Sequence, residues 1–262
     1  MIRAFCLLAL LASVSSGIQA GSRPEPVLLS PIDQPGEPSS KSMLPDGTVL
    51  MHTTLFQSAD SEVALGRVAI EGAALPKENI DYSDVFLVTR GSATVTGPDG
   101  KSSRIKAGDI VLLPRGLLLN ARDLRGYMHL FASFDRQKDF SVAGPKLMQR
   151  LRPEGLHRGE FVEDNGVLRH DYYTGQGGVV VAAERFRDQS SGAGKRKAAE
   201  SCLMFVAGGS GSVIDSQGHE LPLRPHTALF IPKGAEYQMS SRKLLTVTVL
   251  FDRTASIEGT GK

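Results

Sequence analysis

The chain has 262 residues, of which 41% are hydrophobic, and its net charge is +2 at pH 7. This length suits one large domain or two of ordinary size, and the apolar content excludes a disordered chain. The near-neutral charge gives no reason to expect a nucleic-acid partner. The one basic run, Lys195–Lys197, is predicted to be a solvated loop.

The N-terminus has the layout of a secretory signal peptide. Arg3 precedes the apolar stretch Phe5–Val14, and small and polar residues follow up to Ala20. We predict cleavage after Ala20, with an uncleaved anchor as the alternative. The apolar run is too short to span a bilayer comfortably. We therefore expect a periplasmic or secreted protein with no integral membrane segment after cleavage. Cys202 then remains as a single cysteine, which we expect to be a buried small hydrophobe.

A Pro- and Ser-rich leader segment, residues 21–45, is followed by an internal repeat with a constant spacing of 118 residues. Matched pairs include His52 and His170, Arg67 and Arg185, Gly91 and Gly209, and Pro114 and Pro232. A spacing held over so much of the chain indicates two copies of a whole domain. We therefore divide the chain into a signal peptide (1–20), the leader (21–45), barrel 1 (46–140), a linker (141–163), barrel 2 (164–255) and a C-terminal tail (256–262).

Each copy has the pattern of an all-β domain. Short β-branched and aromatic runs alternate with turn residues. The strands predicted in copy one are Thr48–Phe56, Val63–Ile70, Val85–Thr89, Ser92–Thr96, Ser103–Ile105, Ile110–Leu113 and Tyr127–Phe134. Lys146–Leu151, between the copies, is the best candidate for a short helix, and Gly208–Gly211 is predicted to be a β-turn. Many short strands with regularly spaced turns favour a sandwich or a jelly-roll barrel.

Two short motifs resemble those of the cupin superfamily. Gly108, Pro114 and Gly116 have the spacing of the second cupin motif, and Asp84 precedes Gly91 as the acidic residue of the first motif does. In copy two, His226 stands where the second motif has its Gly. The sequence around these motifs is most similar to that of cupins related to ethanolamine-utilisation proteins and ureidoglycine aminohydrolase. The resemblance implies an all-β fold of two tandem jelly-roll barrels, a bicupin.

The resemblance also implies where a metal would be held, because typical cupins use three His and one Glu. Those four positions fall on Glu78, Ile80, Asp84 and Leu119 in copy one, and on Arg196, Ala198, Cys202 and Tyr237 in copy two. Ile, Leu and Ala side chains offer no lone pair, and Arg brings a positive charge. We therefore expect no metal of the family's kind and no cofactor.

Several residues are candidates for binding a ligand. His52 and His170, matched by the repeat, are either ligand-binding imidazoles or structural histidines inherited with the duplication. Arg67 and Arg185 either point inward to bind a carboxylate or phosphate, or face solvent. Tyr237 either contacts a ligand or fills the core.

A metal-free acid–base site is the alternative in copy one. Glu78, Tyr82 and Asp84 share the parity of one strand, and His129 lies in a strand expected to line the same barrel. We name Asp84, Tyr82 and His129 as candidate catalytic residues, with solvent-facing carboxylates and a core histidine as the structural alternatives.

Three functions remain open at this stage. The leading hypothesis is an exported bicupin that binds a small molecule without the usual metal. The second is a metal-independent isomerase, lyase or hydrolase that uses the acid–base residues above. The third is a structural role, in which a barrel filled by Phe86, Leu113 and Leu119 contributes only to assembly, with a homodimer as one outcome.

Overall fold

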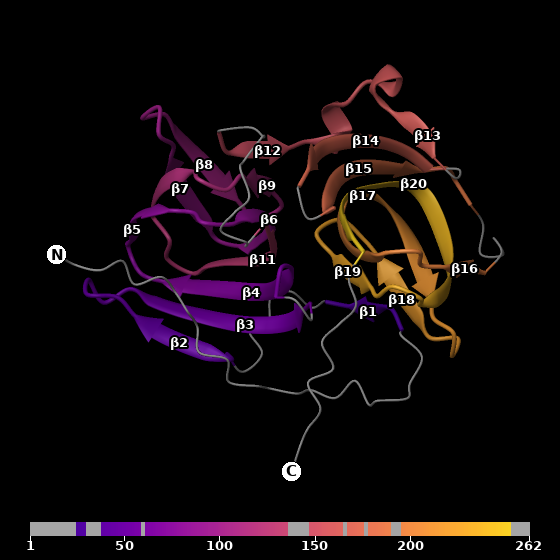
Figure 1. Ribbon diagram of the computed structural model, residues 1–262, viewed down its shortest axis with the longest axis horizontal. Helices are drawn as coiled ribbons and strands as arrows, with labels where there is room; N and C mark the ends of the chain where they lie inside the picture. The colour runs from indigo at the N-terminus through magenta and orange to yellow at the C-terminus, as the bar shows by residue number, and fades with distance from the viewer. Residues whose placement is uncertain are drawn as a thin grey trace, which may run out of the picture.

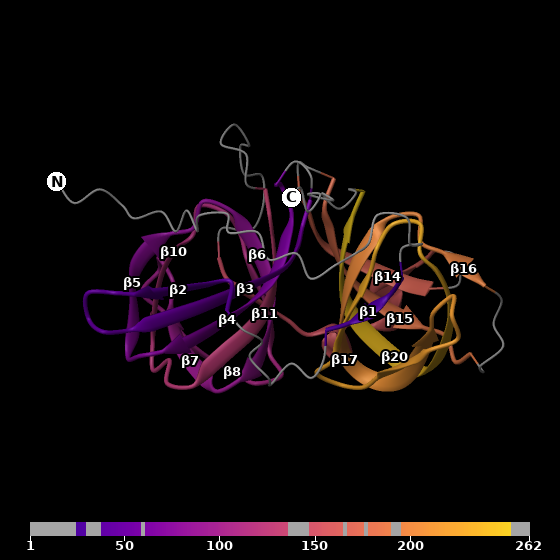
Figure 2. The ribbon, with the colours of Figure 1, turned by 90° about the horizontal axis from the view of Figure 1, so that it is seen from below.

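The computed structural model describes residues 25–29, 38–58, 61–135, 147–164, 167–175, 178–189 and 195–252. The predicted signal peptide and the C-terminal tail lie outside these ranges. The described residues form two β-barrels side by side, one from each copy of the repeat (Figure 1, Figure 2). The prediction of an all-β fold with two jelly-roll barrels is confirmed. No helix in the described part of the chain is long and apolar enough to cross a membrane.

Barrel 1 consists of two sheets. The larger has the strand order β12-β9-β6-β11-β4-β3-β2 and the smaller the order β5-β10-β7-β8. The strands are β2 (Ser40–Met43), β3 (Val49–Gln57), β4 (Ala64–Glu71), β5 (Ala74–Asn79), β6 (Ser83–Arg90), β7 (Ser92–Thr96), β8 (Ser102–Lys106), β9 (Ile110–Leu113), β10 (Leu118–Arg122), β11 (Tyr127–Phe134) and β12 (Gln149–Leu151).

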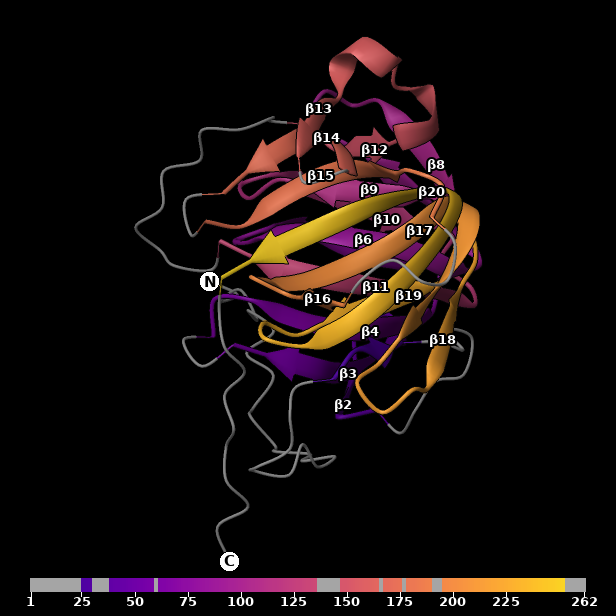
Figure 3. The ribbon, with the colours of Figure 1, turned by 90° about the vertical axis from the view of Figure 1, so that its right-hand side faces the viewer.

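Barrel 2 is built on a sheet with the order β1-β19-β17-β20-β15-β14-β13, to which β16 and β18 add by pairing with β20 and β17 (Figure 3). Two short 3-10 turns, Pro153–Gly155 and Arg158–Glu160, precede it. The strands are β1 (Val27–Leu28), β13 (Val162–Asp164), β14 (Val167–Thr174), β15 (Val180–Phe186), β16 (Arg196–Lys197), β17 (Ser201–Ile214), β18 (Glu220–Leu223), β19 (Ala228–Ile231) and β20 (Glu236–Phe251).

The strands predicted in copy one all form, and Ser92–Thr96, Ile110–Leu113 and Tyr127–Phe134 have the observed bounds. The helix predicted at Lys146–Leu151 is wrong, because Gln149–Leu151 pairs with the free edge of β9 and buries Leu151. The turn predicted at Gly208–Gly211 is also wrong. Those residues lie inside β17, where two register shifts produce bulges that need glycine. A Cβ on Gly209 would lie 2.0 Å from the backbone oxygen of Lys243.

Alternate residues of each strand serve two different cores. Along β11, Leu130, Ala132 and Phe134 belong to an apolar cluster that also contains Val247, Val249 and Phe251 of β20. This cluster joins the two barrels, and we call it the inter-barrel core. The intervening residues of β11 face the interior of barrel 1. Barrel 2 has its own interior cluster, which includes Met204 and Met239. The face on which a residue lies therefore decides whether it can meet a ligand inside a barrel.

The segment that precedes each copy adds a strand to the other copy's barrel. β12 pairs with β9 of barrel 1, whereas β1 pairs with β19 of barrel 2, as Figure 2 shows for the indigo strand against the orange barrel. Leu29 and Leu151, at the ends of these strands, are both buried in the inter-barrel core. The leader is thus not a loose tether, because residues 27–29 complete barrel 2.

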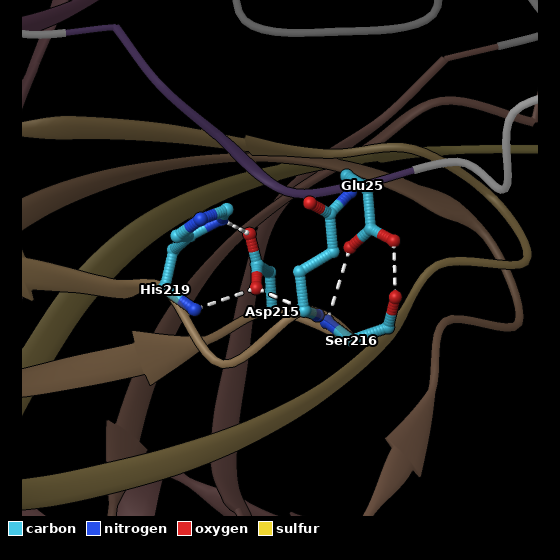
Figure 4. A network of polar contacts seen from close by, with 5 residues as sticks. Glu25, Asp215, Ser216 and His219 are labelled. Atoms are coloured by element: carbon cyan, nitrogen blue, oxygen red, sulfur yellow. Dashed lines mark hydrogen bonds and ion pairs between the residues drawn. The ribbon is translucent and has the colours of Figure 1, made fainter.

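Glu25 secures the start of this exchanged strand (Figure 4). Its carboxylate accepts hydrogen bonds from the backbone N–H of Ser216, at 3.1 Å, and from the Ser216 hydroxyl. Ser216 lies in the turn between β17 and β18, which Asp215 stabilises by accepting hydrogen bonds from the backbone N–H groups of Gln217 and His219. Burial acts to raise the pKa of Asp215, but these hydrogen bonds and one from the His219 ring outweigh it, so the pKa is lowered. The N-terminal segment is therefore held to barrel 2 by polar contacts as well as by strand pairing.

The strand register corrects the match between the two copies. Ser83 pairs with Phe134 and Ser201 with Phe251, so these strands correspond at spacings of 118 and 117 residues. Leu65 pairs with Ala132, and Val181 pairs with Val249 at the corresponding position. Leu65 therefore corresponds to Val181, at a spacing of 116, because the loops before these strands differ in length.

The matched pairs of His and Arg are consequently not equivalent in space. His52 pairs with Val68 on the interior face of barrel 1, whereas His170 pairs with Ala183 on the opposite face of its sheet. Arg67 pairs with Leu130, whose counterpart Val247 pairs with Ala183, so Arg185, which pairs with Leu245, lies two residues beyond the corresponding position. The interior position that His52 occupies in barrel 1 is occupied in barrel 2 by Arg169, which pairs with Glu184.

The exchanged strand β1 predicts a specific loss of stability. Replacing Leu29, which is 7% exposed, with Ala should lower the free energy of unfolding by about 2 to 4 kcal/mol. The control is Val27→Ala in the same strand, where the side chain is 45% exposed. That change should stay within about 0.5 kcal/mol. Denaturant titration measures both variants, and equal effects would contradict the placement of residues 27–29 in barrel 2.

Candidate functional site

Polar side chains line the interior of barrel 2. Cys202 and Met204 of β17 face inward, and Thr246 and Thr248 of β20 alternate with Val247 and Val249 of the inter-barrel core. The alternation also turns Glu184 inward, two residues before Phe186 of the interior cluster. The inward-facing polar residues include Arg169, Glu184, Arg196, Cys202, Tyr237, Thr246 and Thr248.

Hydrogen bonds hold several of these groups in place. The Thr248 hydroxyl donates to Glu184 Oε2 at 2.9 Å, and the Thr246 and Thr248 hydroxyls lie 3.1 Å apart. The Arg196 guanidinium donates to Gln189 Oε1 at 3.0 Å. Arg169 Nε donates to Asp171 Oδ1 at 2.7 Å. The charged groups are therefore oriented before any ligand arrives, which reduces the entropy lost on binding.

The same side chains share one electrostatic environment. Burial, chiefly, raises the pKa of Tyr237 to about 12, with Cys202 and Glu184 adding to the effect and Arg196 opposing it. Burial also raises the pKa of the Cys202 thiol, as do Glu184 and Glu200, against the opposing charge of Arg169. Tyr237 is thus a neutral hydrogen-bonding group and Cys202 an unreactive thiol at neutral pH.

Barrel 1 has a different interior, filled largely by aromatic rings. The His129 ring lies 4.7 Å from Phe86, 5.4 Å from Tyr127 and 6.1 Å from Phe131, measured between ring centroids. Phe131 in turn lies 5.3 Å from His52 and covers Gly66, where a Cβ would come within 2.7 Å of the ring. Phe86, Leu113 and Leu117 are buried in this interior cluster, and Leu119 packs against it.

His129 is neutral in this setting. Burial and the nearby His52 lower its pKa to about 3, and its Nδ1 atom is buried with no hydrogen-bond partner in the described residues. The ring therefore supplies no positive charge to the barrel at physiological pH. A neutral imidazole in an aromatic setting suits packing better than anion binding.

Asp84 and His129 are not brought together. Both face the interior of barrel 1, but Asp84 pairs with Ser133, four residues from His129 along β11. The Phe86–Phe131 pair lies between them, and four residues of strand span roughly 13 Å. Asp84 is buried at the start of β6, and the half-buried Tyr82 lies two residues before it. The acid–base arrangement of Asp84 with His129 would therefore need a rearrangement of these strands.

The remaining candidates lie between the barrels. Arg67 donates a hydrogen bond to the backbone oxygen of Leu29 at 2.8 Å, which ties barrel 1 to the exchanged strand. The Arg185 guanidinium lies 4.5 Å above the Phe161 ring. His170 Nδ1 lies 3.0 Å from the backbone oxygen of Glu160. These contacts position chain segments around barrel 2. Each of the three residues therefore has a structural role in the described part of the molecule.

A buried polar network between the barrels was not predicted from the sequence. Asp135 Oδ2 accepts hydrogen bonds from the Ser83 hydroxyl at 2.9 Å and from the Tyr173 hydroxyl at 2.6 Å. Burial and this contact with Asp135 raise the pKa of Tyr173 to about 12. The backbone N–H of Arg115 also donates to Ser83, as Lys233 does to Ser201 in copy two. The backbone of each Pro-x-Gly motif is therefore anchored to the start of β6 or of β17.

The residues at the family's metal positions do not fit that metal. In barrel 2 the four positions hold Arg196, Ala198, Cys202 and Tyr237, a set with a fixed positive charge and a thiol that burial keeps protonated. In barrel 1, Ile80 and Leu119 carry no ligand atom. Among the described residues, no three His, Cys, Asp or Glu side chains are grouped so as to hold a metal ion.

Comparison with solved structures settles the fold. A protein of unknown function from Pseudomonas syringae pv. tomato superposes with a TM-score of 0.61 at 16% identity, over 87% of this chain and all of that one. A cupin 2 conserved barrel domain protein from Leptotrichia buccalis gives a TM-score of 0.55 at 9% identity, over 78% and 89% of the two chains. Both halves of the chain have the cupin fold.

A third solved structure supports the bicupin arrangement. Protein Ylba from E. coli gives a TM-score of 0.53 at 12% identity, over 94% of this chain and 97% of that one. No protein-family model matches the sequence, and no curated protein matches it. At these identities the likeness extends to the fold alone, so the function must be argued from the inward-facing residues of this bicupin.

The neutral state of His129 predicts a pH dependence of stability. An unfolded His takes up a proton near pH 6.5, and the folded one only near pH 3, so stability falls as the pH is lowered through this window. The loss from this group is about 1.4 kcal/mol per pH unit. Denaturation at pH 7 and pH 4.5 should show a smaller decline for His129→Gln than for the wild type.

The control for this experiment is His157→Gln, at an exposed histidine, which should keep the wild-type decline. Histidine NMR gives the direct check, because the His129 ring should not titrate between pH 5 and pH 8. A His129 ring that titrates near its ordinary value would contradict its burial beside His52.

Proposed function

We propose that this protein is an exported bicupin that binds a small molecule inside barrel 2 without the metal of the family. The observation that carries the proposal is the inward-facing polar set of barrel 2, held in place by hydrogen bonds. Ligand sites in proteins are concave, with a few oriented polar groups among apolar walls. The signal-peptide pattern at residues 1–20 supports export.

The chemistry of this set favours a small carboxylic acid that also carries a hydroxyl or amino group. Arg169 and Arg196 supply forked N–H donors suited to a carboxylate. Glu184 accepts a hydrogen bond from a hydroxyl or ammonium group, and Tyr237 donates one through its protonated hydroxyl. Met204 and Met239 supply apolar walls that adapt to the ligand's shape.

Several corresponding positions in barrel 1 are apolar instead. Phe131 corresponds to Thr248 and Leu119 to Tyr237, and Phe86 corresponds to Met204. The larger apolar side chains fill barrel 1, which supports a structural role for it. A metal-free enzyme using Asp84, Tyr82 and His129 is the less favoured alternative, because the Phe86–Phe131 pair lies between Asp84 and His129.

Binding should depend on the two inward-facing arginines. A thermal-shift screen of small hydroxy and amino acids and sugars identifies a stabilising compound, and calorimetry measures its affinity. Arg196→Gln and Arg169→Gln should each weaken binding by about 10- to 100-fold, because each removes hydrogen bonds from a charged donor. Folding is checked by circular dichroism, since Arg169 also contacts Asp171.

The matched control is Arg224→Gln, at an exposed arginine of barrel 2, which should leave the affinity unchanged. Wild-type affinity in both test variants would place the site elsewhere. Loss of binding in His129→Gln, with barrel 2 variants unaffected, would move the site to barrel 1.

A further inference from the structure

A basic hollow lies on the surface of barrel 1, between residues of β8 and the segment that contains β12. It is open to solvent, has a volume of about 370 Å³ and is lined by Ser103, Arg104, Met148, Arg150 and Arg152. Met148 also packs against the interior cluster of barrel 1, so the hollow has an apolar component. Its lining contains three guanidinium groups and no carboxylate.

Two of these arginines are held in place by the protein. Arg150 donates a hydrogen bond to the backbone oxygen of Arg104 and lies 3.4 Å from Asp109 Oδ2. Arg104 donates to the Ser92 hydroxyl at 3.2 Å. Asp109 offsets one of the three positive charges, so an excess of about two remains around a single concave surface. Oriented guanidinium groups of this kind bind oxyanions through paired N–H donors.

The second copy shows that the fold does not require these charges. Arg104 corresponds to Pro222, because β8 and β18 pair in the same register with β7 and β17. Arg150 corresponds to Leu28, since each pairs with the matching residue of β9 or β19. Met148, two residues before Arg150, corresponds to Pro26. The same seam in barrel 2 is therefore apolar, and the basic hollow is a feature of barrel 1 alone.

We infer that this hollow is a phosphate-binding site, which takes either free phosphate or the phosphate group of a small ester. A phosphate presents more acceptor oxygens than a carboxylate does, so it is better suited to engage several guanidinium groups at once. The hollow opens to solvent on barrel 1, whereas the proposed small-molecule site lies inside barrel 2. The inference therefore stands apart from the proposed function.

Calorimetry on the full mature chain tests this site, with inorganic phosphate and glycerol 3-phosphate as probes at constant ionic strength. We expect binding to the wild type and about tenfold weaker binding to Arg152→Gln and to Arg104→Gln. The control is Arg125→Gln, at an exposed arginine elsewhere on barrel 1, which should bind as the wild type does. Arg224→Gln, at an exposed arginine of barrel 2, should also leave phosphate binding unchanged.

The relative affinities identify the source of the phosphate. Tighter binding of glycerol 3-phosphate identifies a small phosphate ester as the ligand, and tighter binding of inorganic phosphate identifies free phosphate. Both results support the site. Three results would overturn the inference: no heat of binding from either probe, wild-type affinity in the double variant of Arg104 and Arg152, or an equal loss in Arg125→Gln. The last result would mean that phosphate responds only to the overall charge of the protein.

Discussion

Apolar packing between the two barrels organises the whole molecule. One face of β11 and one face of β20 contribute to a single core that neither barrel completes alone. This contact commits alternate residues of the central strands to the interface and leaves the intervening residues to the barrel interiors. The exchanged strands β1 and β12 strengthen the same contact, because each ends in a leucine buried between the barrels. Burial at this interface therefore decides which side chains remain available for a ligand.

The interiors of the two copies differ, whereas both copies contribute apolar side chains to the inter-barrel core. Positions that face the inter-barrel core hold aliphatic or aromatic residues in both copies, such as Leu65 and Val181. Some positions that face inward hold apolar side chains in barrel 1 and hydroxyl groups in barrel 2, such as Phe131 and Thr248. At the contact between the two copies, equivalent positions also differ in the size of their side chains. A Cβ on Gly108 would lie 2.5 Å from the ring of His226, so a side chain fits there from one copy only.

His226 shows what that divergence required of the backbone. It replaces the Gly of the second cupin motif and yet keeps a positive φ of 69°, close to the 93° of Gly108. A non-Gly residue rarely adopts this conformation, which costs on the order of 1 kcal/mol. The turn is thus fixed by the fold, and packing against the other barrel compensates for the strain.

The sequence was sufficient for the architecture because the repeat and the strand periodicity can be recognised without knowing any tertiary contact. The 118-residue spacing and the Gly and Pro turns predict two β-barrels, and the Pro-x-Gly spacing places them in the cupin fold. Strand exchange was not predictable, because Val27–Leu29 is short and pairs with residues about 200 positions away. The short β12 was mistaken for a helix for the same reason, since an edge of β9 rather than its own pattern decides its conformation.

The site could be predicted only in part, because a sequence match does not fix the face of a strand. His52 and His170 align in sequence, but a difference of one or two residues in neighbouring loops puts them on opposite faces. The same difference in loop length explains why the sequence comparison missed Arg169 and Glu184. These two residues are adjacent to the matched residues His170 and Arg185. Glu184 did carry a signal that the sequence analysis missed, since it is a lone carboxylate in the otherwise apolar start of β15.

The account holds that barrel 2 works through oriented side chains rather than through the metal of typical cupins. The most direct test is elemental analysis of the protein, purified without a His tag from medium that contains Mn, Fe, Ni and Zn. The account predicts far less than one equivalent of any of these metals per chain. About one equivalent of a single metal, retained through dialysis, would contradict it and would require ligands other than Arg196, Ala198, Cys202 and Tyr237.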